Sequence, residues 1–177
     1  MASINIEFKA RTANIDDLES KLLELDPVFI GEDQQVDTYF NVKSGRLKLR
    51  EGKIENALIY YERPDTADSK QSDIILYPHT PDQSLKEMLV KLHGIKVIVD
   101  KIRKIYFIDN VKFHFDHVTA LGTFVEVEAI DKTGETGIEK LREQCEKYAD
   151  FFGIQPADYI SVSYSDMMLG EKRQIAL

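Results

Sequence analysis

The sequence predicts an α+β domain in which about eight strands form an antiparallel β-barrel with flanking helices. The first observation is the alternation of apolar and charged residues with period two, which recurs along most of the 177 residues. The second is that these segments follow one another through short turns and are interrupted by three segments of helical periodicity. The length fits one domain, so we expect residues 1–177 to fold as a single unit.

The expected strands are bounded by turn residues. Residues 4–11 alternate strictly, with apolar side chains on one face and Asn5, Glu7, Lys9 and Arg11 on the other. The Asp109-Asn110 pair predicts a hairpin between two of the later strands. The remaining expected strands are 35–42, 46–51, 57–63, 73–77, 97–108, 111–118 and 123–130. A polar stretch, residues 64–72, is expected to form a mobile loop.

The expected helices are recognised by apolar residues on one face and by their ends. The first follows the N-cap Asn14 and ends before Pro27, and the second covers residues 84–93 and stops at Gly94. The third covers residues 137–152, with Thr136 and Glu139 as a capping box and Gly153 at its end. Residues 156–170 are ambiguous, and we expect a short helix at 158–160 and a strand or turn at 163–168.

Composition excludes several classes of protein. Hydrophobic residues at 43% and charged residues at 31% are typical of an ordinary globular domain, and no apolar run approaches the ~20 residues of a membrane span. The formal charge of −8 disfavours nonspecific binding to nucleic acid or anionic membranes. Cys145 is the only cysteine, and the N-terminus lacks a signal-peptide pattern, so we expect a cytoplasmic setting.

The charged faces of the strands separate by sign. One strand places Arg46, Lys48 and Arg50 on the same face, whereas acids gather on other strands. The other charged positions are Lys101 and Arg103, Lys112, His114 and Asp116, and Glu126 and Glu128. The simplest interpretation is that these faces meet water, as most charged strand faces do. Same-sign triplets are unusual on exposed faces, however, and a basic wall beside an acidic corner suits a polyphosphate with its metal ion.

No alternative motif competes with this interpretation. The sequence has no P-loop, no GxGxxG turn, no HExxH helix and no nucleophile elbow. His114 shares the presumed inner face with Asp116, where it could aid phosphate binding or serve the structure.

Seven segments in order resemble the CYTH superfamily of triphosphate tunnel metalloenzymes, and within it the class IV adenylyl cyclase-like branch. These segments are residues 5–11, 37–40, 46–51, 60–65, 100–106, 114–128 and 163–166. The resemblance implies an eight-stranded barrel with a charged tunnel that binds a triphosphate and divalent cations, here Mg²⁺ or Mn²⁺. The family's opening signature Glu-x-Glu-x-Lys reads Asn5-Ile6-Glu7-Phe8-Lys9, so an amide replaces the first acid. An amide can ligate a metal through its oxygen but brings no charge.

The resemblance also implies roles for individual residues. The metal ligands would be Glu7, Asp116, Glu126 and Glu128, and the catalytic residues Glu7, Lys9 and Arg103. The phosphate wall would consist of Lys9, Arg46, Lys48, Arg50, Lys101 and Arg103. Glu62 and Arg63 stand where family members often carry a basic residue, and the sequence leaves open which of them enters the tunnel.

Three functions remain open at this stage. The first is an adenylyl cyclase that converts ATP into 3′,5′-cyclic AMP and pyrophosphate. The second is a phosphohydrolase acting on inorganic triphosphate, thiamine triphosphate or a nucleoside triphosphate. The third is a noncatalytic binder of nucleotides or polyphosphate, which Asn5 favours. The expected partner is a small triphosphate such as ATP or inorganic triphosphate, with no nucleic acid or membrane, and the resemblance is compatible with a homodimer.

Overall fold

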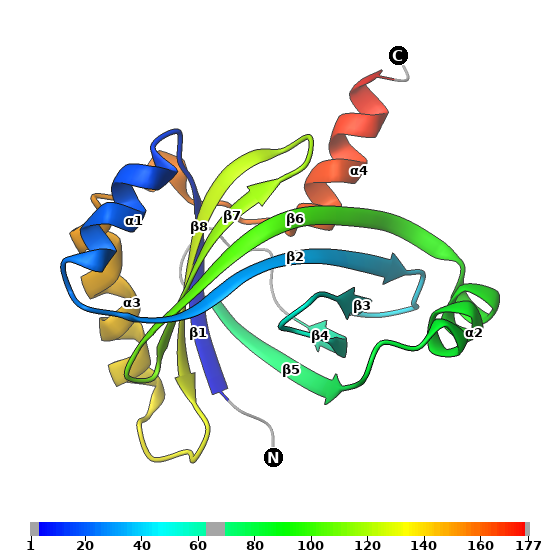
Figure 1. Cartoon of the computed structure of the whole chain (residues 1–177), viewed down its shortest axis with the longest axis horizontal. Coiled ribbons are helices and arrows are strands. Elements are labelled where there is room, and N and C mark those ends of the chain that lie inside the picture. Colours follow the sequence, from blue (N-terminus) through cyan, green and yellow to red (C-terminus); the bar gives the residue numbers. More distant parts are fainter. Residues whose placement is uncertain (1–3, 63–69, 176–177) are drawn as a thin grey trace.

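Eight antiparallel strands close into a barrel in the computed structural model, which describes residues 4–62 and 70–175 (Figure 1). Their order around the ring is β1-β5-β4-β3-β2-β6-β7-β8, and β8 pairs back onto β1. The strands are β1 (Ile4–Arg11), β2 (Val28–Phe40), β3 (Arg46–Glu51), β4 (Ala57–Glu62), β5 (Lys70–Pro78), β6 (Ile95–Ile108), β7 (Val111–Val118) and β8 (Gly122–Asp131). The predicted fold class is confirmed.

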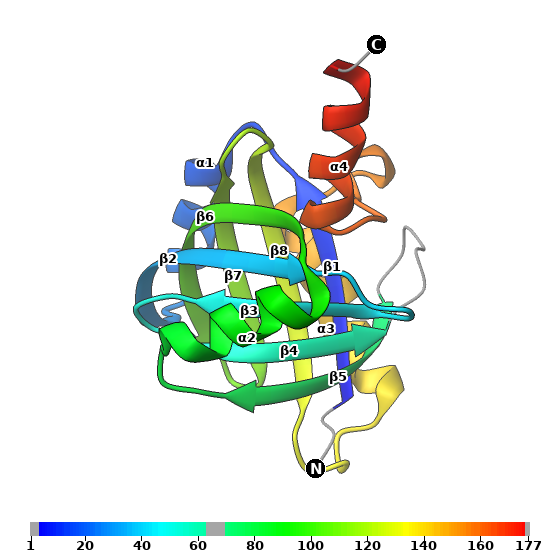
Figure 2. The same cartoon turned by 90° about the vertical axis from the view of Figure 1, so that its right-hand side faces the viewer.

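Helices cover the outside of the barrel on two sides. The helices α1 (Ile15–Leu23) and α3 (Ile138–Phe152) lie against β1, β7 and β8, at the left of Figure 1. The helix α2 (Gln83–His93) packs near β2, β3 and β4. A short 3₁₀ helix, η1 (Pro156–Asp158), precedes α4 (Tyr164–Ile175), which rises beside β6 at one end of the barrel (Figure 2).

The period-two pattern decides which side chains enter the barrel. On β1, the fully buried Ile6 and the buried Phe8 face α1 and α3, where they join Leu22, Phe113 and Leu141 in one core. Burying these apolar faces under the helices turns the intervening charged residues of the same strands toward the barrel axis. The apolar side chains of these strands point outward and form the core with α1 and α3, so the barrel interior beside them is polar.

Two strands begin three or more residues earlier than expected. The strand β2 starts at Val28 rather than at residue 35, because the 14-residue β6 offers a pairing partner along its whole length. A register shift between Phe29 and Gly31 lets the ladder continue through a segment whose apolar–polar alternation is broken. Within the loop expected at residues 64–72, Lys70 already begins β5, and residues 64–69 lie outside the described part of the chain.

The expected capping box at Thr136 and Glu139 is wrong. No side chain at the N-cap position bonds to α3; instead the buried Asp131, at the end of β8, accepts hydrogen bonds from the backbone N–H groups of the following turn. The donors are Thr133, Gly134, Thr136 and Gly137, at N–O distances between 2.7 and 3.2 Å. One carboxylate thereby fixes the connection from the barrel into α3, which ends as expected at Gly153 in a left-handed conformation.

The strand or turn expected at residues 163–168 is a helix. Ser163 Oγ accepts from the Asp166 N–H at 3.2 Å, and the Asp166 carboxylate accepts from the Ser163 N–H at 3.3 Å, so the pair caps the first turn of α4. The expected helix at 158–160 lies slightly earlier, as η1. None of the helices in the described residues is both long and apolar enough to span a membrane.

Candidate functional site

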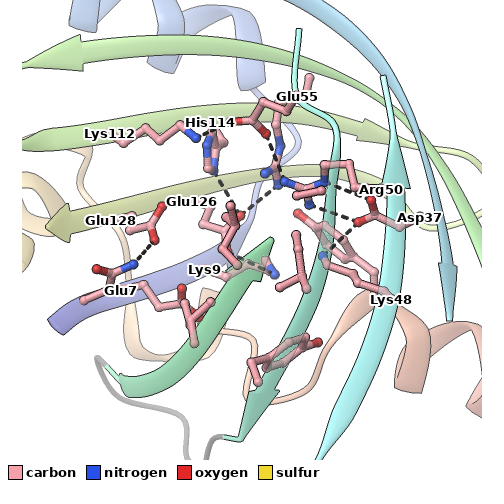
Figure 3. A pocket seen from close by; sticks show the side chains of 18 of the residues that line it. Glu7, Lys9, Asp37, Lys48, Arg50, Glu55, Lys112, His114, Glu126 and Glu128 are labelled. Carbon is pink, nitrogen blue, oxygen red and sulfur yellow. Dashed lines mark hydrogen bonds and ion pairs between the residues drawn. The ribbon is translucent and has the colours of Figure 1, made fainter. Parts of the chain in front are cut away.

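A cavity of about 570 Å³ occupies the interior of the barrel. Its wall is mixed, with charged side chains from β1, β2, β3, β6, β7 and β8 and apolar side chains mainly from β4 and β5. Figure 3 shows the charged groups turned toward one another. Of the residues expected at the site, the lining includes Glu7, Lys9, Lys48, Arg50, Lys101, Arg103, Glu126 and Glu128.

The cations of β3 and β6 share one carboxylate. Asp37 of β2 accepts from Lys48 Nζ at 2.9 Å, from Arg50 Nε at 2.9 Å and from Lys101 Nζ at 2.8 Å. Burial opposes ionisation of this carboxyl, but Arg50, Lys101 and Lys48 outweigh it and hold the pKa of Asp37 well below its usual value. Burial, opposed by Asp37 and reinforced by Arg50 and Arg103, lowers the pKa of Lys101 to about 7. Three basic side chains thus share one carboxylate, so an incoming anion would meet a net positive charge.

Arg103 is fixed from behind by Asp116. The Arg103 Nε and Nη2 atoms donate to the two oxygens of Asp116 at 2.6 and 2.5 Å, and Tyr164 Oη donates to Asp116 Oδ2 at 2.8 Å. Arg103 Nη2 also reaches Glu126 at 2.9 Å. Asp116, expected as a metal ligand, is fully buried and does not line the cavity. Its geometry is that of a residue that positions Arg103.

The acids of β1 and β8 form a corner opposite the cations. Glu7 pairs directly with Glu128 across the two strands, and Lys9 pairs with Glu126. Burial and the neighbouring charge of Glu7 raise the pKa of Glu128 to about 7, and Asn5 Nδ2 donates to Glu128 Oε1 at 2.5 Å. The close approach of two buried carboxyls favours a cation between or beside them.

Glu126 is already engaged with bases of the protein. Lys9 Nζ lies 3.3 Å from Glu126 Oε1, and His114 Nδ1 lies 3.2 Å from Glu126 Oε2. Burial opposes ionisation of Glu126, but Lys9, His114 and Arg103 hold its pKa well below the usual value. Burial, Arg103 and Lys112 lower the pKa of His114 to about 3, so the imidazole is neutral and its Nδ1–H donates to the carboxylate.

A profile of the CYTH domain matches residues 3–164, nearly all of the chain and every strand of the barrel. The chain belongs to the CYTH domain family. This CYTH domain is 25% identical over 167 residues to the adenylate cyclase CyaB of Aeromonas hydrophila, a match that covers 90% of the chain and 85% of CyaB.

Solved structures show the same fold. The PH1012 protein of Pyrococcus horikoshii superposes with a TM-score of 0.80 at 23% identity, covering 92% of this CYTH domain and 98% of that chain. A Hippeastrum protein, described as a candidate adenylyl cyclase with a dominant triphosphatase activity, superposes with a TM-score of 0.61 at 15% identity, covering 97% and 96%. The activities that these two proteins carry in their names are adenylate cyclase for CyaB and triphosphatase for the Hippeastrum protein.

The donor set of this CYTH domain fits a hard divalent cation. Glu7 and Glu128 offer adjacent carboxylates, and the amide oxygen of the buried Asn5 has no hydrogen-bond partner. Among the described residues, no group of three or more His, Cys, Asp or Glu side chains is arranged to hold a metal by itself. Two carboxylates with an amide oxygen are a partial oxygen shell of the kind that a hard divalent cation such as Mg²⁺ takes, because Mg²⁺ commonly binds one or two carboxylates and completes its shell with waters and phosphate oxygens.

Two predicted positions lie away from this cavity. Arg46 does not line it; Arg46 Nη2 donates to Asp166 at 2.8 Å, at the beginning of α4. Glu62 is exposed and accepts a hydrogen bond from Tyr60 Oη at 2.5 Å, so it does not enter the barrel. Arg63 lies outside the described residues.

Sequence reasoning gave no site role to Asp37, Glu55 or Lys112, which all line the cavity. The alternation of β2 could have placed Asp37 inside, because it stands opposite Arg50 in the β2–β3 ladder. The alternation of residues 111–118 places Lys112 on the inner face of β7, but it does not indicate that Glu55 is its ion-pair partner. Glu55 lies in the connection between β3 and β4, where no periodicity indicates the direction of a side chain.

Proposed function

We propose that this CYTH domain is a divalent-metal-dependent enzyme that acts on a triphosphate held in its barrel. One observation carries the proposal: within a single cavity, Lys48, Arg50, Lys101 and Arg103 stand on one side and the Glu7–Glu128 pair on the other. A triphosphate carries about four negative charges, which a buried cavity can accept only with such compensation. The preferred reaction is that of a class IV-type adenylyl cyclase.

The residues of the chain would perform distinct tasks in this reaction. The basic wall would align the triphosphate and stabilise the charge that develops on the leaving pyrophosphate. Arg103, held in one orientation by Asp116, is the preorganised member of that wall. Lys9, 4.0 Å from the centroid of the Tyr164 ring, would contact phosphate oxygens from the opposite side. A bound Mg²⁺ or Mn²⁺, held by Glu7 and Glu128, would neutralise phosphate charge and polarise the reacting phosphorus.

In cyclisation, the ribose 3′-oxygen bonds to the α-phosphorus while the bond from that phosphorus to the bridging oxygen breaks. The hydroxyl proton is released and pyrophosphate leaves. This reaction requires room for a nucleoside, and the apolar part of the cavity offers it. Its side chains include Ile59, Tyr61, Ile74, Leu76 and Phe107.

The second candidate is a triphosphatase that acts on inorganic triphosphate, thiamine triphosphate or a nucleoside triphosphate. The named triphosphatase activity of the Hippeastrum protein supports it. Water would then attack the terminal phosphorus, the bond from that phosphorus to the bridging oxygen would break, and orthophosphate and the remaining diphosphate would be released. Noncatalytic binding is the third candidate, supported by Asn5 at the position of the family's first acid.

Product analysis distinguishes these functions. The pure protein is incubated with ATP or inorganic triphosphate and with Mg²⁺ or Mn²⁺. Cyclic AMP with equimolar pyrophosphate supports the cyclase, and orthophosphate supports the triphosphatase. Triphosphate binding without turnover, unchanged by Asn5→Glu, would refute both enzymes. Arg103→Met and Glu128→Gln should abolish turnover while the far-UV circular dichroism stays unchanged, and Glu51→Gln, outside the cavity, is the control.

A further inference from the structure

Glu55 brings a carboxylate into the cavity from a turn rather than from a strand. It lies in the connection between β3 and β4, and its oxygens receive three donors. Arg50 Nη1 donates at 2.9 Å, Gln35 Nε2 donates at 2.9 Å, and Lys112 Nζ contacts the second oxygen. Figure 3 shows this carboxylate near Lys112 and the Arg50 guanidinium.

These donors come from different parts of the ring, because Gln35 belongs to β2, Arg50 to β3 and Lys112 to β7. Their convergence on two oxygens is the arrangement in which a phosphate group would be held, with charge-assisted hydrogen bonds from an arginine and a lysine. We propose that Glu55 occupies a phosphate-binding position of the cavity, and that a triphosphate must displace it to bind. The inference rests on the proposed function, since it concerns how the same cavity selects its anion.

The Glu55 carboxylate is more accessible than the Asp37 carboxylate. The Glu55 side chain is 22% exposed and lies in a turn, whereas the Asp37 side chain is 2% exposed and lies within β2. The backbone beneath Glu55 is anchored, because Asp33 accepts from the N–H groups of Lys53, Ile54 and Glu55 at 2.6, 3.0 and 2.9 Å. Displacement therefore requires only rotation of the Glu55 side chain, and the turn stays in place.

This arrangement selects for long anions. A single phosphate can bind Arg50 and Lys112 only after the Glu55 carboxylate has left them. One anion then replaces another, and the net gain in binding free energy is small. A triphosphate makes the same exchange once but also reaches Lys48, Lys101 and Arg103, which line the same cavity. Glu55 thus raises the charge that an anion needs before it binds, and the other cations of the cavity let a triphosphate meet that requirement.

The test measures anion binding by calorimetry without metal for the wild type, Glu55→Gln and Glu55→Asp. Glutamine removes the charge at nearly the same shape, and aspartate keeps the charge but shortens the reach by one methylene. The control Glu51→Gln makes the same charge change at the end of β3, where Glu51 pairs with Lys86 outside the cavity. The probes are inorganic triphosphate and orthophosphate.

We expect Glu55→Gln to bind triphosphate about tenfold more tightly than the wild type, to bind orthophosphate more tightly by a similar factor, and Glu55→Asp to fall between. Unchanged or weaker triphosphate binding by Glu55→Gln, with normal binding by the wild type, would overturn the inference. If Glu55→Gln does not fold, an unchanged affinity of Glu55→Asp overturns it. If neither the wild type nor any variant binds triphosphate, with or without added Mg²⁺, the proposed function itself fails.

Discussion

Replacing Asp37 by asparagine would remove the carboxylate on which three buried cations depend. Lys48, Arg50 and Lys101 reach it at 2.8 to 2.9 Å. At an effective dielectric constant of about 20, each such contact is worth about 6 kcal/mol of Coulomb energy, most of which desolvation offsets. Removing one partner of a buried pair leaves the others uncompensated, and typically costs about 3–5 kcal/mol. We therefore expect Asp37→Asn to lower the free energy of unfolding by about that amount.

Urea unfolding followed by far-UV circular dichroism measures the effect. The midpoint should fall while the slope of free energy against urea stays constant. The control Glu51→Gln breaks an ion pair whose side chains are 26% and 34% exposed, and should cost less than about 1 kcal/mol. Added triphosphate should stabilise Asp37→Asn more than the wild type, because the freed cations bind it more tightly. A loss below about 1 kcal/mol for Asp37→Asn would refute the assigned role of this carboxylate.

Three further predictions concern protonation, the cation and the fold. Because the pKa of Lys101 is lowered to about 7 and a bound anion raises it, metal-free triphosphate binding should take up a proton at pH 8 and weaken as the pH rises above 7. Calorimetry in buffers of different ionisation enthalpy measures that proton, and its absence contradicts the prediction. Glu128→Gln should weaken Mn²⁺ binding about tenfold or more, as seen by electron paramagnetic resonance, and an unchanged affinity would exclude Glu128 as a ligand. Gly153→Ala should lower the free energy of thermal unfolding by about 1–2 kcal/mol, because Gly153 has φ +71° and an added Cβ would meet backbone strain rather than a neighbouring atom. An unchanged stability would show that the end of α3 tolerates a Cβ in this conformation.

The alternation of single strands predicted most of the cavity wall. On β1, the apolar Ile6 and Phe8 had to face the core, which forces Glu7 and Lys9 inward whatever the rest of the chain does. The neighbour of each inward residue could not be obtained in this way, because it depends on the order of strands around the ring. Asp116 shows the difference: its face was predicted correctly, but Arg103 beside it takes both oxygens.

Turns and chain ends were predicted less well, because periodicity gives no direction there. Glu55 enters the cavity through a turn that Asp33 holds by backbone hydrogen bonds, an interaction between residues about 20 apart. The pair Ser163 and Asp166 carries a local signal for the start of α4, since serine followed three residues later by an acid is a capping pattern. The rest of residues 156–170 is ambiguous in sequence, and the strand or turn expected there is wrong.

The shared contact of Asp37 constrains how this barrel can change over time. Its carboxylate belongs to β2, and its three partners lie on β3 and β6, the neighbours of β2 on either side. A mutation at any one of these four positions alters the charge balance felt by the other three, so their effects on stability cannot be additive. Lineages that adapt the tunnel to another anion should therefore replace these residues as a group, and single replacements should appear mainly where a second change has already compensated for them.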